Sequence, residues 1–240
     1  MAFLVLSGLT KRFGPVTAER GLDLQISRGE IYALLGPNGA GKTTTLRMIA
    51  GITPPTSGTV VLDGLDLEKS SAIVKSKFFF IPDRPYLYEK LTGREYLEFL
   101  INIYGRGDVS TLKELLIEFE MTSRLDQFIE SYSHGMRQKL LLAAAFMLDP
   151  PLLIVDEPLV GLDPKSSAVL KRKLVEFSQG GRISLISTHQ LALAESIASR
   201  VGIIHLGRML AEGSAQDLRD LSKRPTLEEA FLTLTESEEN

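Results

Sequence analysis

The stretch Gly36-Pro37-Asn38-Gly39-Ala40-Gly41-Lys42-Thr43 decides how this sequence folds. It follows an apolar run at 31–35 and precedes a second apolar-periodic stretch, TTLRMIA. The spacing G-x-x-x-x-G-K-[ST] between such flanks is typical of a strand, a phosphate-binding loop and a helix in succession. The alternative is a glycine-rich turn that merely joins strand to helix, and the flanks disfavour it.

Each residue type in this loop has a physical reason. Small residues let backbone N–H groups curl around phosphate oxygens, and the following helix points its partly positive end at the same anion. Lys42 adds a positive charge for the β- and γ-phosphates, and Thr43 offers a hydroxyl to Mg²⁺. We expect Lys42 to lie on a surface loop rather than in the core. The residues expected to contact nucleotide here are Gly36, Pro37, Asn38, Gly39, Ala40, Gly41, Lys42, Thr43 and Thr44.

Two carboxylates follow another apolar run. The run at 152–155 should lie inside a sheet and end in Asp156 and Glu157 at its carboxyl edge, where ligands bind in open α/β sheets. We expect Asp156 to hold Mg²⁺ through its water shell, and Glu157 to accept a proton from the attacking water or to orient it. Taken alone, the pair could equally end a strand in solvent. The phosphate loop upstream favours the catalytic interpretation.

Short β-rich runs bounded by Gly or Pro alternate with helical patterns along the chain. The runs lie at 3–6, 22–26, 31–35, 60–62, 78–81, 152–155, 183–187 and 201–205. Several are too continuously apolar for half-exposed strands, which predicts a mostly parallel, buried sheet with helices on both faces. The first three runs are closely spaced and should include an antiparallel pair. The predicted class is α/β, with an N-terminal antiparallel β subdomain.

No strand pattern appears between Pro85 and Phe146. The segments 93–104, 110–119 and 133–148 carry apolar residues at helical spacing, and prolines mark both edges of the region. This predicts an inserted helical subdomain. Within a single domain, 1–240, we therefore expect a nucleotide-binding core with its β subdomain at 1–82 and 151–215. The helical subdomain is expected at 83–150 and a C-terminal helical tail at 216–240.

A second anion-binding pattern stands upstream of Asp156. Tyr132-Ser133-His134-Gly135-Met136-Arg137-Gln138 resembles the signature of ABC ATPases, usually LSGGQ followed by R-Q. Ser133 is a good helix N-cap, and Gly135 permits close approach of an anion to the backbone. The alternative is an ordinary capped core helix. The order of the motifs, over nearly the entire chain from about Leu4 to Leu232, makes the resemblance to ABC transporter ATP-binding subunits specific.

This resemblance implies a P-loop NTPase fold of the ABC type and an ATPase that uses ATP and Mg²⁺. It also implies that Ser133 and Gly135 close on the γ-phosphate held by a second ATP-binding subunit, identical or different. Phe13 matches the residue that stacks on adenine, Asp163 the D-loop at the dimer seam, and His189 the histidine that contacts the γ-phosphate. Taken singly, an aromatic residue such as Phe13 is more often core, and a histidine after a strand is usually a surface residue.

Asp83 departs from the family pattern, because most ABC subunits carry glutamine after the proline at this position. A carboxylate can approach Mg²⁺ but cannot donate a hydrogen bond to the attacking water. A hinge role toward a membrane subunit does not depend on amide chemistry. The predicted metal ligands are Thr43, Asp156 and Asp83, and the predicted catalytic residues are Glu157, His189 and Lys42.

Two further features resemble one branch of the family. His134 and Met136 replace a glycine and a glutamine of the signature, and similar variants occur in the branch of drug, sodium, polysaccharide and bacteriocin-immunity exporters. TLEEAFL at 226–232 resembles the C-terminal ending of that branch. Export through a separate membrane permease is therefore favoured. The segment that begins at Asp83 and contains Tyr86 would meet that permease in the family, although plain packing explains its side chains equally well. His205 fits no family motif and is expected to be structural.

Composition limits the partners. Hydrophobic residues make up 44% and charged residues 24% of the 240, as in ordinary globular domains. The formal net charge of -3 provides no positive field for a nucleic acid, which we do not expect as a partner. The chain contains no cysteine, which excludes disulfides and thiol catalysis.

The longest apolar run, 140–148, is about half of the ~18 residues that a spanning helix needs. We therefore expect another protein to cross the membrane and this chain to lie at its cytoplasmic face. Two other functions remain open. A soluble ABC protein of translation or DNA maintenance usually has two cassettes or long coiled coils, and a regulator that binds ATP but hydrolyses it poorly would be compatible with Asp83.

Overall fold

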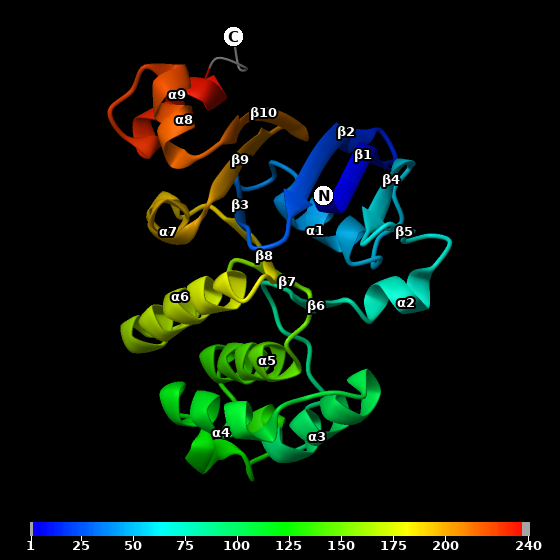
Figure 1. The fold of residues 1–240 in the computed structure, drawn as a ribbon, viewed down its shortest axis with the longest axis vertical. Coiled ribbons are helices and arrows are strands. Elements are labelled where there is room, and N and C mark those ends of the chain that lie inside the picture. Colours follow the sequence, from blue (N-terminus) through cyan, green and yellow to red (C-terminus); the bar gives the residue numbers. More distant parts are fainter. Residues whose placement is uncertain (1, 237–240) are drawn as a thin grey trace.

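A computed structural model describes residues 2–236 and arranges them around two β-sheets (Figure 1). The strands are β1 (Ala2–Phe13), β2 (Val16–Ser27), β3 (Ile31–Leu35), β4 (Ser57–Leu62), β5 (Leu65–Asp66), β6 (Phe78–Ile81), β7 (Leu152–Asp156), β8 (Ile183–Thr188), β9 (Arg200–His205) and β10 (Arg208–Gly213). The helices are α1 (Lys42–Ile49), α2 (Ser71–Lys75), α3 (Gly93–Tyr104), α4 (Val109–Glu118), α5 (His134–Leu148), α6 (Pro164–Gln179), α7 (Leu191–Ile197), α8 (Ala215–Ser222) and α9 (Leu227–Glu236).

The larger sheet carries the order β10-β9-β3-β8-β7-β6, and all of its pairs are parallel except β10 with β9. The carboxyl ends of parallel strands share one edge, so the segments that follow β3, β7 and β8 meet there. The register sets Leu35 beside Thr188 and Asp156 beside Ser187. This edge therefore brings together residues that lie far apart in the sequence.

The smaller sheet is antiparallel, with the order β2-β1-β4-β5. The expected antiparallel pair near the N-terminus is confirmed as β1 with β2, whose register shifts at several points mark bulges. Two strands escaped the sequence analysis, β5 and β10. Both are at sheet edges and partly exposed, so neither has the continuous apolar run that marks a buried parallel strand.

Apolar residues fill both faces of the larger sheet, as its continuous apolar strands predict. In β3, Ala33 and Leu35 face one apolar cluster, which also contains side chains of α5, α6 and α7. Tyr32 and Leu34 face a second cluster, which is closed by α1 and the antiparallel sheet. The mostly parallel sheet with helices on both faces is thus confirmed, with the small sheet sharing one of those faces.

Helices α3, α4 and α5 occupy the region where the sequence predicted helices (Figure 1). Thr92 begins α3 with a capping box, and Asp149 ends α5 in a left-handed conformation. Within residues 2–236 this region contains no strand, although Thr92 and Phe128 form an isolated bridge.

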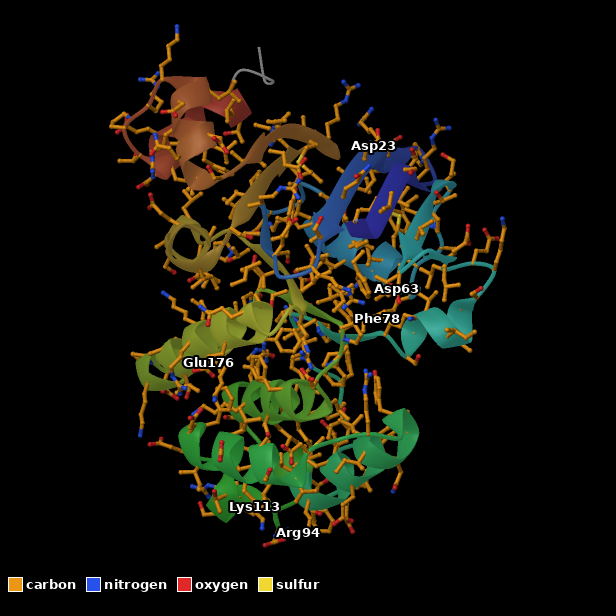
Figure 2. The ribbon with its side chains drawn as sticks, in the orientation of Figure 1. Asp23, Asp63, Phe78, Arg94, Lys113 and Glu176 are labelled. Atoms are coloured by element: carbon orange, nitrogen blue, oxygen red, sulfur yellow. The ribbon has the colours of Figure 1, made fainter. Side chains whose placement is uncertain are left out.

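Figure 2 shows Arg94 and Lys113, on α3 and α4, at the opposite end of the molecule from Asp23 in the antiparallel sheet. The division at 1–82, 83–150, 151–215 and 216–240 stays a prediction. Residues 1 and 237–240 of those segments lie outside the described residues. Among residues 2–236, no helix has the length and apolarity required to span a bilayer.

Candidate active site

The loop at 36–41 joins the end of β3 to the start of α1. Gly39 and Gly41 have φ angles of 82° and 116°, in the region that favours glycine. A Cβ atom at Gly36 would collide with the carbonyl oxygen of Ile204, so a side chain cannot be accommodated there. No side chain caps α1, which leaves the N–H groups of its first turn directed into the loop. The loop therefore presents backbone donors and the positive end of a helix to an anion.

Lys42 begins α1 and bends back over this loop. Its Nζ donates hydrogen bonds to the carbonyl oxygens of Gly36 at 2.7 Å and Pro37 at 3.1 Å. Only 6% of the residue is exposed, so the expectation of a lysine on a surface loop is wrong. The reason is that the loop closes around its own lysine. Burial lowers the pKa of Lys42, and the carboxylates of Glu157 and Asp156 oppose that shift.

Asp156 ends β7 with none of its surface exposed. The hydroxyl of Thr43 donates to its Oδ2 at 2.7 Å, and the hydroxyl of Ser187 on β8 donates to its Oδ1. Burial raises the pKa of Asp156, the two hydrogen bonds lower it, and the nearby carboxylates of Asp83 and Glu157 raise it further. Thr43 and Asp156 therefore place a hydroxyl and a carboxylate oxygen together at one point of the sheet edge, and Mg²⁺ prefers oxygen ligands of this kind.

Glu157 turns the chain away from the sheet with a left-handed φ of 51°. A non-glycine residue in this conformation costs on the order of 1 kcal/mol, a strain typical of functional sites. Its backbone N–H donates to the carbonyl of Ser187 at 2.9 Å. The carboxylate accepts from the hydroxyl of Thr188 at 3.2 Å and lies 2.9 Å from Nδ1 of His189. The end of β8 therefore orients the Glu157 side chain.

A cavity of about 230 Å³ opens between these segments and is lined by Ala18, residues 38–44, Asp83 and Glu157. Asp83, the residue that departs from the family pattern, thus borders the same space as Lys42. Phe13 is not among the lining residues. It lies at the end of β1, is 52% exposed, and has Nζ of Lys11 at 5.1 Å from its ring centroid. This exposure excludes the alternative in which Phe13 is a core residue.

The signature residues lie outside that cavity. Ser133 is exposed and caps α5, with its Oγ accepting from the N–H of Met136 at 3.3 Å. A Cβ atom at Gly135 would collide with the carbonyl oxygen of Gly161, which precedes α6. The signature is therefore packed against the loop before α6. Ser133 and Gly135 do not line the cavity beside Lys42. Three other residues of the signature line a second cavity together with Asp83 and Glu157; they are Tyr132, His134 and Arg137.

An ion pair between Asp163 and Lys139 connects helix α5 to the loop that precedes α6. Asp163 caps α6 by accepting from the N–H and hydroxyl of Ser166, both at 2.9 Å, and it pairs with Nζ of Lys139 at 2.7 Å. The hydrogen bond with Lys139 and those from Ser166 hold the pKa of Asp163 well below its usual range. Sequence reasoning missed Lys139, because its partner lies on another helix.

Ser187 and Thr188 were also missed, although a signal existed. They are small polar residues at the end of an otherwise apolar strand, directly before the predicted His189. Because β8 lies beside β7, these hydroxyls reach Asp156 and Glu157.

Comparison with known proteins gives one consistent result. A family model described as ABC transporter matches residues 20–160. An ABC-type transporter ATP-binding protein, EcsA, of Bacillus subtilis (strain 168) is 35% identical over 99% of this chain and 98% of its own length. A Nod factor export ATP-binding protein of Cupriavidus metallidurans is 34% identical over 91% of this chain and 73% of its own length. A solved ATP-binding subunit of an ABC transporter superposes with a TM-score of 0.90 at 35% identity, covering 97% of this chain and 99% of that one.

Proposed function

This chain belongs to the ABC transporter family as an ATP-binding and ATP-hydrolysing subunit, and we propose that two such subunits close on two ATP molecules and drive a separate membrane permease. The observation that supports this most directly is the separation of two anion-binding features. Lys42 and Glu157 border one cavity, whereas Ser133 caps a helix outside it. Each chain would therefore complete the site of its neighbour.

The hydrolysis step uses the residues at the sheet edge. A water molecule attacks the γ-phosphorus, the bond to the β–γ bridging oxygen breaks, and Glu157 accepts the proton of the water. Lys42 compensates charge on the β- and γ-phosphates, and His189 stands beside Glu157 to contact the γ-phosphate. The hydroxyl of Thr188 and Nδ1 of His189 keep the Glu157 carboxylate in one orientation.

Thr43 and Asp156 would hold Mg²⁺, and Asp83, which lines the same cavity as Thr43, would bind it through water. Their hydroxyl and carboxylate oxygens fit a hard cation that keeps several waters and shares phosphate ligands. When bound, Mg²⁺ supplies positive charge that offsets the charge of the phosphates. The remaining proposed nucleotide contacts are the phosphate loop, 36–44, and Phe13 at the adenine. We propose that the second subunit contributes further contacts to the same nucleotide through Ser133, Gly135 and Asp163.

We propose export as the direction of transport and the cytoplasmic face of the membrane as the location. The signature variant and the 226–232 ending support this, and so does the similarity to a Nod factor export protein. To test the function, a tagged chain is purified from detergent-extracted membranes and its partners are identified. Recovery of a polytopic membrane protein with Mg²⁺-dependent phosphate release is expected. Recovery with ribosomes or DNA instead would contradict the proposal.

Asp83→Gln is expected to increase catalytic efficiency, kcat/KM for MgATP, on the order of tenfold at low salt. The change removes one negative charge beside a polyanion and restores a hydrogen-bond donor for the attacking water. Steady-state phosphate release at low and high salt measures the effect. The increase in kcat/KM should be smaller at high salt, because salt ions screen the charge of Asp83. Glu68→Gln removes an exposed charge and serves as the control. Equal efficiency of Asp83→Gln and wild type would remove Asp83 from the nucleotide site.

Ser133→Ala is expected to lower turnover about 10²-fold, the scale for losing one hydrogen-bond donor to a reacting phosphate. Loss of the cap on α5 also costs about 1 kcal/mol of stability. Thr92→Ala removes the cap of α3 and is the matched control for that cost. Phosphate release and thermal melting are measured on both variants. If the two variants lose the same turnover, Ser133 acts only as a helix cap.

A further inference from the structure

A buried carboxyl lies beneath the phosphate loop. Glu19, on β2, has none of its surface exposed. Its Oε1 accepts a hydrogen bond from the hydroxyl of Thr45 in α1 at 2.8 Å. Its Oε2 is buried without a hydrogen-bond partner among residues 2–236. Burying a polar group without a full set of hydrogen-bond partners costs free energy. The retention of a carboxyl at this position therefore suggests a functional role.

The contacts of Glu19 connect it to the loop as well as to the helix. A Cβ atom at Gly41 would collide with Oε1 of Glu19 and lie 2.9 Å from the carbonyl oxygen of Ala18. Gly41, with a φ of 116°, is the N-cap residue directly before α1, and Ala18 lines the cavity next to Lys42. The Glu19 carboxyl therefore supports the turn that aims the first backbone N–H groups of α1.

Burial raises the pKa of Glu19 to about 8, and the hydrogen bond from Thr45 opposes that shift. The carboxyl is therefore mainly protonated and uncharged at pH 7, and becomes mainly ionised by pH 9. The ionised form would compete with phosphate for the positive end of α1.

The elements packed around Glu19 carry several charged or titratable side chains. On β2 itself, Nε of Arg20 donates to the carbonyl of Leu206. On β1, Nζ of Lys11 donates to the carbonyl of Pro54, and Lys42 is turned toward its own loop. His205 ends β9 and Arg208 begins β10, on either side of the turn whose Gly207 approaches the backbone of Glu19. Arg47 lies in the last turn of α1.

We propose that Glu19 is a positioning residue of the phosphate loop, whose uncharged carboxyl holds the Gly41 turn for phosphate binding and whose ionisation weakens nucleotide affinity in alkaline solution. It touches the loop and not the nucleotide. The proposal rests on the assignment of the cavity beside Lys42 to the phosphates. It adds a residue to that site which the family signature motifs do not contain.

The test is the Kd of MgADP, measured by calorimetry between pH 7 and 9 on wild type, Glu19→Gln and Glu68→Gln. The ratio of the wild-type Kd to that of Glu19→Gln should rise about tenfold over this range, because only wild type gains the charge. Titration of Lys42 is common to both proteins and cancels in the ratio. Glu68→Gln should follow wild type. A ratio that does not change with pH would overturn the proposal.

Two further variants separate the possible failures. Glu19→Ala removes the acceptor of Thr45 and should raise the KM for ATP about tenfold at pH 7 with little change in kcat. This difference from wild type should shrink towards pH 9, where only wild type gains the charge. An unchanged KM would contradict the positioning role. Lys42→Ala is measured in the same binding assay. If Lys42→Ala loses affinity while the ratio of the wild-type Kd to the Glu19→Gln Kd does not change with pH, only the inference about Glu19 fails. If Lys42→Ala binds nucleotide as tightly as wild type, the phosphate site itself is rejected.

Discussion

Glu157→Gln is expected to lower steady-state phosphate release by about 10²- to 10⁴-fold, the usual effect of removing a general base. Glutamine has the same size, and its carbonyl oxygen can still accept from Thr188, but it cannot accept the proton of the attacking water. ATP binding should be preserved, because the phosphate loop and Lys42 are untouched. Release of inorganic phosphate and nucleotide binding are measured on the same preparation.

The same variant tests the pairing of subunits. With hydrolysis blocked and MgATP saturating, closed pairs should accumulate, and light scattering after size exclusion should give the mass of a dimer. Glu114→Gln, an exposed position on α4, is the control for the chemical change. A strictly monomeric Glu157→Gln protein under these conditions would contradict the two-subunit site, and a wild-type rate of phosphate release would remove Glu157 from the mechanism.

Lys42→Ala is expected to weaken MgATP binding about 10²-fold. A charge-assisted contact to phosphate in a buried site contributes about 3 kcal/mol, which converts to that factor. The lysine is also buried and donates to two loop carbonyls, so its loss affects the loop as well as the charge. Titration calorimetry gives the Kd, and circular dichroism monitors the fold.

Removing Lys42 should leave the global fold intact, because the deleted ammonium is itself costly to bury and the apolar clusters do not contain it. Lys69→Ala removes an exposed lysine after β5 and serves as the control. An affinity equal to that of wild type would exclude Lys42 from phosphate binding. An unfolded Lys42→Ala protein would instead show that the loop needs this lysine for folding.

The buried parallel strands and the helical region were predictable from apolar patterns. The expected run at 31–35 coincides with β3, and 93–104 coincides with α3. Strand β10 was not predictable, because its half-exposed sequence lacks a continuous apolar run. This segment becomes a strand by pairing with β9. The expected strand at 3–6 proved to be part of the longer β1, whose later residues are partly exposed.

Part of the candidate site was predictable in the same way. Thr43, Asp156 and Glu157 were expected from local motifs, and Thr43 and Asp156 prove to be hydrogen-bonded across 113 residues of sequence. The burial of Lys42 and the hydroxyls that orient Glu157 were not predicted. Neither was Glu19, because nothing in the sequence around it indicates which helix it meets.

By itself, the sequence determined the phosphate loop, the acidic strand end and the capped signature helix, because each depends on residues that are adjacent or within one turn of each other. Tertiary structure alone decided the raised pKa of Glu19, the enclosure of Lys42 and the orientation of the Glu157 side chain. Those properties depend on burial and on partners from other strands, such as Thr188 beside Glu157. A linear pattern specifies which groups are present, whereas their dielectric surroundings and neighbours exist only after the sheet has assembled.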